Sequence, residues 1–219
     1  MPPASLESIN EPRGLGSRPA RPCVVIQVRE LTSEHATRAL VADVRQALTG
    51  GAPAVAVLCA AGTKLLRARE QLRDLDRVLA PLAQTLSARV SRSATDGLAA
   101  WAASLVTPVG VDVQSAPASL ETEVMHAALH PEEAAWLAGQ HRPELAFAAL
   151  WSGKEAVLKA FGVGLAWSPR EVLAAPVTAA WRALQVGTLG HAWLSHLQVD
   201  VVPSVALAVA LNAGQVAPD

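Results

Sequence analysis

Residues 151–159 have the sequence WSGKEAVLK, and this stretch is the most informative one for the fold and the site of the chain. Read as a helix, it places Trp151, Glu155 and Lys159 at every fourth residue, stacked along one face. Lys154 lies beside that face, one residue before the carboxylate. A carboxylate flanked by two ammonium groups suits a Mg²⁺ ion and the phosphates it neutralises, because Mg²⁺ takes oxygen ligands from one or two carboxylates and from substrate phosphates.

A second carboxylate, Asp112, stands upstream at the end of a short apolar strand predicted over Pro108–Val113. One Asp at a strand end and one Glu on a helix are enough to hold such an ion. An isolated Glu followed by Lys four residues later indicates only a surface ion pair, worth roughly 0.2–0.5 kcal/mol. The functional interpretation therefore depends on the two motifs occurring together.

Together the two motifs resemble those of the 4′-phosphopantetheinyl transferase superfamily, in its single-chain type with two halves. WSGKEAVLK is similar to the family signature W-[ST]-x-K-E-[SA]-x-x-K, and VGVDV at 109–113 is similar to its G-[IV]-D element, in the same order and at the usual separation. The HPEE stretch at 130–133 looks like the helix start between the two motifs, and VSRS at 90–93 looks like the "SHS" strand. The resemblance covers residues 86–210, and weaker features extend it to 29–70.

This resemblance implies a Mg²⁺-dependent reaction in which a carrier-protein serine attacks the β-phosphate of coenzyme A and 3′,5′-ADP is released. Asp112 and Glu155 would hold the ion, with Gln114 as a third candidate ligand. Lys154 and Lys159 would lie against the phosphates as positive charges. Glu155 would accept the serine proton, either directly or through a metal-bound water, and the sequence leaves both routes open.

The chain departs from the family pattern at two expected site positions. Gln114 stands where many members carry Glu, so one negative charge is lost although an amide oxygen can still coordinate. Arg92 stands where His is common, and a permanent cation suits the 3′-phosphate of coenzyme A. Ser91, Arg38 and Lys64 are further candidates for binding the nucleotide.

The expected fold is α+β. The resemblance implies two similar half-domains related by pseudo-twofold symmetry, with the active site in the cleft between them, and therefore a monomer. We expect a disordered leader over 1–22, an N-terminal half over 23–107 and a C-terminal half over 108–219 that carries both motifs.

Local patterns predict the elements of each half. Apolar runs bounded by turn residues predict further strands at 23–28, 54–58, 88–91, 98–104, 180–186, 191–197 and 205–211. Helical spacing predicts helices at 34–48, 121–129, 131–138 and 143–161, and one or two helices over 65–86 with a break near Pro81.

Composition excludes several classes of function. A net charge of −1 gives no basic footprint for nucleic acid, and no run of eighteen apolar residues predicts a membrane span. Cys23 and Cys59 are too few for a disulfide framework, so we expect a cytoplasmic protein. With 219 residues, 51% of them hydrophobic, the chain can bury a sizeable core.

A second hypothesis is a catalytically weakened relative that binds coenzyme A or a carrier protein without turnover. It is motivated by Gln114, by Arg92 and by the Gly62-Thr63-Lys64 stretch, which resembles an altered form of the family's Gly-Lys-Pro turn. The sequence does not predict which acyl or peptidyl carrier protein is served, whether in fatty-acid, polyketide or nonribosomal peptide synthesis, nor whether the altered N-terminal half keeps full affinity for coenzyme A.

Overall fold

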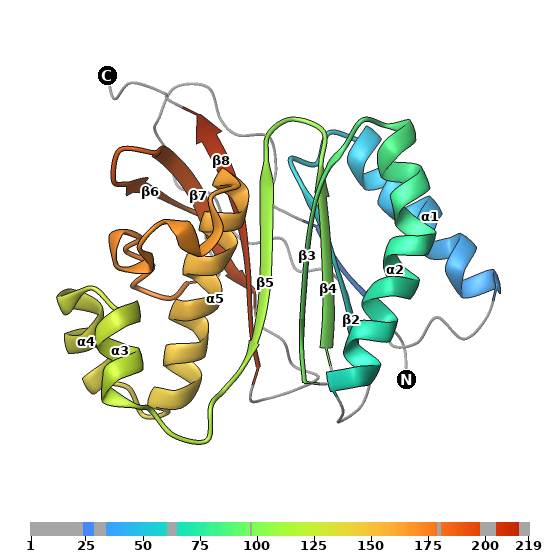
Figure 1. Ribbon diagram of the computed structural model, residues 1–219. Helices are drawn as coiled ribbons and strands as arrows, with labels where there is room; N and C mark the ends of the chain where they lie inside the picture. Colours follow the sequence, from blue (N-terminus) through green and yellow to red (C-terminus); the bar gives the residue numbers. More distant parts are fainter. Residues whose placement is uncertain are drawn as a thin grey trace.

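Two four-stranded sheets pack face to face at the centre of the molecule, with helices on the outer face of each sheet (Figure 1). The structure is a computed structural model, and it describes residues 24–28, 34–60, 65–96, 98–178, 181–197 and 205–214. Mixed helices and mainly antiparallel strands agree with the α+β class predicted from the sequence.

The first sheet has the strand order β1-β2-β4-β3 and is built from β1 (Val24–Val28), β2 (Val55–Ala60), β3 (Arg89–Thr95) and β4 (Leu98–Ser104). Only β1 and β2 are parallel. Helices α1 (Glu34–Thr49) and α2 (Leu65–Thr85) cover its outer face. Their buried leucines pack on Val55, Val57 and Trp101 of the sheet.

The second sheet is antiparallel throughout and has the order β5-β8-β7-β6. Its strands are β5 (Val109–Ser115), β6 (Arg182–Val186), β7 (Gly190–Leu197) and β8 (Val205–Gly214). Helix α5 (Pro143–Phe161) packs along its outer face, and the short helices α3 (Thr122–Ala128) and α4 (Pro131–Ala138) lie beyond α5 (Figure 1). Two 3₁₀ turns, η1 (Gly164–Ala166) and η2 (Pro169–Glu171), follow α5.

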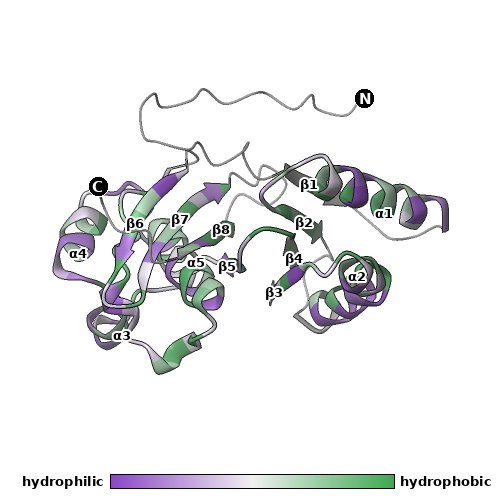
Figure 2. Cartoon of the chain, turned by 90° about the horizontal axis from the view of Figure 1, so that it is seen from above, coloured by the Kyte–Doolittle hydropathy of each residue, from purple (hydrophilic) through white to green (hydrophobic). Residues whose placement is uncertain are grey.

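A core between the sheets joins the two halves of the chain. Alternate residues of β2, β4, β5 and β8 point into it, among them Leu58, Leu98, Val111 and Val209, all buried. This period of two is what a strand with one face on a core requires. Figure 2 shows many hydrophilic residues on the outer helices α1, α2 and α4.

Most predicted elements are present within a few residues of their expected bounds, and helix α5 has the bounds predicted for it. The break expected at Pro81 was wrong, because α2 runs through it without interruption. Proline removes one helical hydrogen bond, but Leu75, Leu79 and Leu82 bury an apolar stripe on both sides of it. Packing of that stripe on the sheet offsets the missing bond.

The two sheets divide the chain between Ser104 and Val109, close to the expected boundary. The half-domain boundaries themselves and the pseudo-twofold relation stay predictions. None of the described helices is both long and apolar enough to cross a membrane.

Candidate active site

Helix α5 meets strand β5 at a glycine, and this contact brings the two sequence motifs together. A Cβ atom on Gly110 would lie 1.8 Å from the carbonyl oxygen of Ala156 and 2.7 Å from the backbone nitrogen of Ala160. Only a residue without a side chain permits this approach. Glu155 and Lys159, next to those two alanines on α5, are therefore held close to Asp112 on β5.

One ammonium group lies between the two expected metal ligands. Lys159 Nζ is 2.6 Å from Asp112 Oδ1 and 3.5 Å from Glu155 Oε2, and it donates a further bond to the carbonyl oxygen of Val111 at 3.3 Å. The side chain of Asp112 is 4% exposed, whereas those of Glu155 and Lys159 are 26% and 29% exposed. One carboxylate is thus buried and fixed, and the other faces solvent.

The surroundings of Asp112 leave its charge incompletely balanced. Its Oδ1 accepts hydrogen bonds from Lys159 and, at 2.7 Å, from Ser93 Oγ. Its Oδ2 is buried and has no hydrogen-bond partner in the part of the chain that the structure describes. Burial raises the pKa of Asp112 to about 6, against the opposing effect of Lys159 and with a further upward contribution from the nearby Glu155.

These residues fit a hard divalent cation. An unpartnered, buried carboxylate oxygen beside a second carboxylate is a donor set that Mg²⁺ accepts, with water and phosphate oxygens completing its shell. Gln114 lies two residues beyond Asp112 on β5, so the two side chains leave the strand on the same face. The described residues hold no cluster of three or more His, Cys, Asp and Glu side chains able to bind a metal. The metal-ligand set of Asp112, Glu155 and Gln114 stays a prediction.

Comparison with protein-family models gives one match, which spans residues 108–210 and bears the description 4′-phosphopantetheinyl transferase superfamily. The match contains β5, α5 and the whole Asp112/Glu155/Lys159 cluster. Residues 108–210 of the chain are thus similar to this superfamily. Among curated proteins, no sequence matches the chain.

Within the matched region, Lys154 lies apart from the Asp112/Glu155/Lys159 cluster. Its side chain is fully buried, with Nζ 2.5 Å from Glu133 Oε2 and bonded to the carbonyl oxygens of Pro169 and Val172. Burial lowers the pKa of Lys154, while Glu133 acts in the opposite direction. The contacts of Lys154 are thus internal, to α4 and to the segment after α5, and a role against the phosphates stays a prediction.

The residues expected at the nucleotide are not gathered at the cluster either. Ser91 is buried, and its hydroxyl accepts a bond from the backbone N–H of Val111. Arg92 points from β3 towards α2, where it forms an ion pair with Asp76 at 2.6 Å (Nε to Oδ1). Arg38 is exposed on α1 and pairs with Glu34 in the same helix. Lys64 lies outside the described residues.

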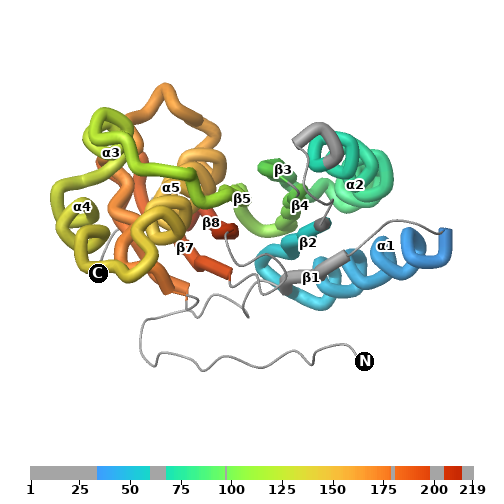
Figure 3. The backbone as a smooth tube through the Cα atoms, turned by 90° about the horizontal axis from the view of Figure 1, so that it is seen from below, coloured from blue at the N-terminus to red at the C-terminus, as the bar shows by residue number. Residues whose placement is uncertain are grey.

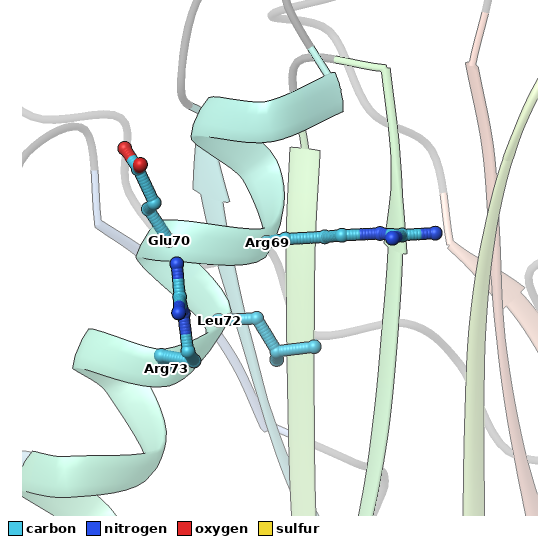
Figure 4. Close-up of a pocket in the computed structure, with 4 residues that line it drawn as sticks. All are labelled: Arg69, Glu70, Leu72 and Arg73. Carbon is cyan, nitrogen blue, oxygen red and sulfur yellow. The ribbon is translucent and has the colours of Figure 1, made fainter.

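A pocket lies on the first half of α2 (Figure 4). It is lined by Arg69, Glu70, Leu72 and Arg73, and in this view Arg69 extends away from Glu70 and Arg73. It lies outside the residues that match the superfamily and contains none of the predicted site residues.

Sequence reasoning missed two partners of the predicted residues, Ser93 and Glu133. Both lie within motifs of the sequence, VSRS and HPEE, but the sequence does not predict what their side chains contact. Alternating hydroxyls at Ser91, Ser93 and Thr95 mark one face of a strand, and this period of two was the available signal for Ser93. Glu133 is the fourth residue of HPEE, and its side chain also caps α4 by accepting from the His130 backbone N–H.

Proposed function

We propose that this protein transfers the 4′-phosphopantetheine arm of coenzyme A to a serine of an acyl or peptidyl carrier protein, with Mg²⁺ as cofactor. The superfamily match over residues 108–210 supports phosphopantetheine transfer in general. The finer claims rest on one observation: Asp112 and Glu155 converge on the Lys159 ammonium, and a buried carboxylate oxygen of Asp112 is unpartnered among the described residues.

The carboxylates of Asp112 and Glu155 would have different roles. Asp112 is buried and held by two hydrogen bonds, which suits a fixed metal ligand. Glu155 is partly exposed, so it can hold the ion and still approach a substrate hydroxyl. Bound there, Mg²⁺ would neutralise negative charge on the pyrophosphate oxygens as a Lewis acid.

The chain's own residues account for the proton and for the remaining charge. Glu155 takes the serine proton as the serine oxygen bonds to the β-phosphorus, and the bond from that phosphorus to 3′,5′-ADP breaks. Lys159 can swing from the carboxylates to the phosphates and stabilise the charge that develops on the leaving group. A monomer and a cytoplasmic location remain predictions from the sequence.

The test is mass spectrometry of carrier proteins incubated with the protein, Mg²⁺ and coenzyme A. A mass gain of one phosphopantetheine arm is expected with the wild type, and no gain with Glu155→Gln. Glu144→Gln is the matched control, because it makes the same change in the first turn of the same helix and should leave transfer intact. No transfer to any of several carriers would favour the alternative of a binding relative without turnover.

A further inference from the structure

The two sheets meet along a row of hydroxyl groups. Strands β3 and β5 are edge strands that lie side by side (Figures 1 and 3). On β3, the hydroxyl oxygens of Ser91, Ser93 and Thr95 accept hydrogen bonds from backbone N–H groups of β5. The donors are Val111 at 3.0 Å, Val113 at 3.3 Å and Ser115 at 3.3 Å. An edge strand leaves such N–H groups unpaired, so this hydroxyl row satisfies the edge of β5.

Ser93 is the member of the row that also contacts the site. Its oxygen accepts from Val113, so its single hydroxyl proton is free to be donated, and Asp112 Oδ1 receives it at 2.7 Å. The ionised carboxylate is only an acceptor, which fixes the direction of that bond. Ser93 is therefore held between a backbone donor and a carboxylate acceptor.

The two bonds on Oδ1 fix the rotation of the carboxylate. The terminal torsion of an Asp side chain is broad and roughly twofold when nothing restrains it. Ser93 from β3 and Lys159 from α5 both bond to the same oxygen, Oδ1. The other oxygen, Oδ2, is then set in one orientation, buried and without a hydrogen-bond partner among the described residues.

We propose that Ser93 is a positioning residue for the metal site, orienting the Asp112 carboxylate so that Oδ2 is presented to Mg²⁺. This inference rests on the proposed function. It also links the site to the N-terminal half, because Ser93 belongs to the first sheet and precedes the residues that match the superfamily.

Lys159 alone would hold the carboxylate less well. Its ammonium is shared between Asp112, Glu155 and the Val111 carbonyl, and in the proposed reaction it moves towards the phosphates. Ser93 stands on a strand, with its oxygen fixed to the neighbouring sheet. Partners that orient a metal ligand in this way typically contribute about 10–100-fold to metal affinity.

The experiment is calorimetric titration of the full chain with Mg²⁺ in the presence of saturating coenzyme A and without a carrier protein. Ser93→Ala should raise the Mg²⁺ dissociation constant by about 10–100-fold. Ser93→Thr keeps the hydroxyl and should recover most of the affinity. Thr95→Val is the control, because it removes a hydroxyl from the same row that does not contact Asp112.

Thermal denaturation of the variants separates positioning from folding. Ser93→Ala and Thr95→Val each leave one β5 N–H without its acceptor, so they should be destabilised alike, while only Ser93→Ala loses metal affinity. Equal Mg²⁺ affinity in wild type and Ser93→Ala would overturn the positioning role alone. Absence of Mg²⁺ binding in the wild type would overturn the metal site of the proposed function, and with it this inference.

Discussion

Lys154 and Glu133 form an ion pair of 2.5 Å in which neither side chain is exposed to solvent. Glu133 also accepts backbone bonds from His130 and Ala174, and Lys154 donates to two carbonyl oxygens after α5. The pair thereby ties α4, α5 and the segment around residues 169–174 to one another. Lys154, the first residue of the Lys-Glu step in the signature, thus contacts the scaffold, and the proposed chemistry would rest on the second, Glu155.

Lys154→Met should destabilise the fold by about 3–5 kcal/mol, because it leaves the Glu133 carboxylate buried without its counter-charge. Urea denaturation measures this loss. The double variant Lys154→Met/Glu133→Gln should lose less than the sum of the single variants, since no buried charge remains. If Lys154→Met has wild-type stability and fails only in transfer, Lys154 instead contacts the phosphates.

The close contact at Gly110 makes a second prediction about stability. In Gly110→Ala, the new methyl group would collide with the backbone of α5, which cannot yield as a flexible side chain can. Overpacking of this kind costs about 1–3 kcal/mol or more, and it should also separate Asp112 from Glu155 and weaken Mg²⁺ binding. Gly139→Ala is the control, because φ is −89° there and the nearest atom to the new Cβ is 3.6 Å away. Equal denaturation midpoints for the two variants would show that α5 and β5 are not pressed together at Gly110.

The sequence predicted helix α5 well because its boundaries are local. Pro143 stands at the first turn, and Gly162 ends the helix with φ at +72°, a conformation that favours glycine. The placing of Glu155 and Lys159 on one face follows from helical spacing alone. Their closeness to Asp112 is expected from the resemblance, and the physical reason for it is the close packing of α5 on Gly110 of β5.

Other parts of the site could not be read from the sequence because they depend on how distant elements pack. Lys154 beside Glu155 reads as an exposed charge, and its burial appears only when α4 is placed against α5. The Ser93–Asp112 bond joins two different sheets, so no spacing rule reveals it. The uninterrupted helix at Pro81 likewise depends on packing of α2 against the sheet, which outweighs the local preference of proline.

The raised pKa of Asp112 predicts a conflict between function and stability. In the folded protein Asp112 stays protonated up to about pH 6, whereas the ordinary pKa of an aspartate is 3.8. Ionisation of this buried carboxyl group therefore lowers the stability of the folded state. Asp112→Asn should therefore be more stable than wild type above pH 6 and should lose both Mg²⁺ binding and transfer. Its advantage should shrink as the pH falls from about 6 to about 4, where the wild-type carboxyl is also neutral.

Denaturation midpoints measured across this pH range check the Asp112 prediction. Asp96→Asn is the control, because Asp96 is exposed in a turn, and its midpoint should follow the wild type. Below pH 6.5, His196 should lower the stability of both the wild type and Asp112→Asn. Burial lowers the pKa of His196 to about 4, so stability is lost as the pH falls through that interval. An Asp112→Asn protein that is less stable than wild type at pH 7.5 would contradict the assigned burial cost.

Gln114→Glu tests whether residue 114 contacts the ion. A third carboxylate on the same face of β5 should lower the Mg²⁺ concentration for half-maximal transfer several-fold, by roughly 1 kcal/mol of added binding. Gln185→Glu adds the same charge on β6 and should leave the titration unchanged. Identical Mg²⁺ curves for wild type and Gln114→Glu would limit the protein ligands to Asp112 and Glu155.

Lys159 should have opposite effects on metal binding and on turnover. Its ammonium lies against both carboxylates, so it competes with a cation for them while stabilising charge in the reaction. Lys159→Met should therefore bind Mg²⁺ more tightly when coenzyme A is absent, and should lose about 1.5–3 kcal/mol in kcat/KM, or one to two decades.

Lys159→Arg keeps the charge and should bind Mg²⁺ as the wild type does. It should recover the rate only in part, because a planar guanidinium replaces a compact ammonium group. Weaker Mg²⁺ binding in Lys159→Met would mean that the ordering of the Asp112 carboxylate by the ammonium outweighs its competition with the cation. Wild-type behaviour in both measurements would reduce Glu155 and Lys159 to an ordinary surface pair.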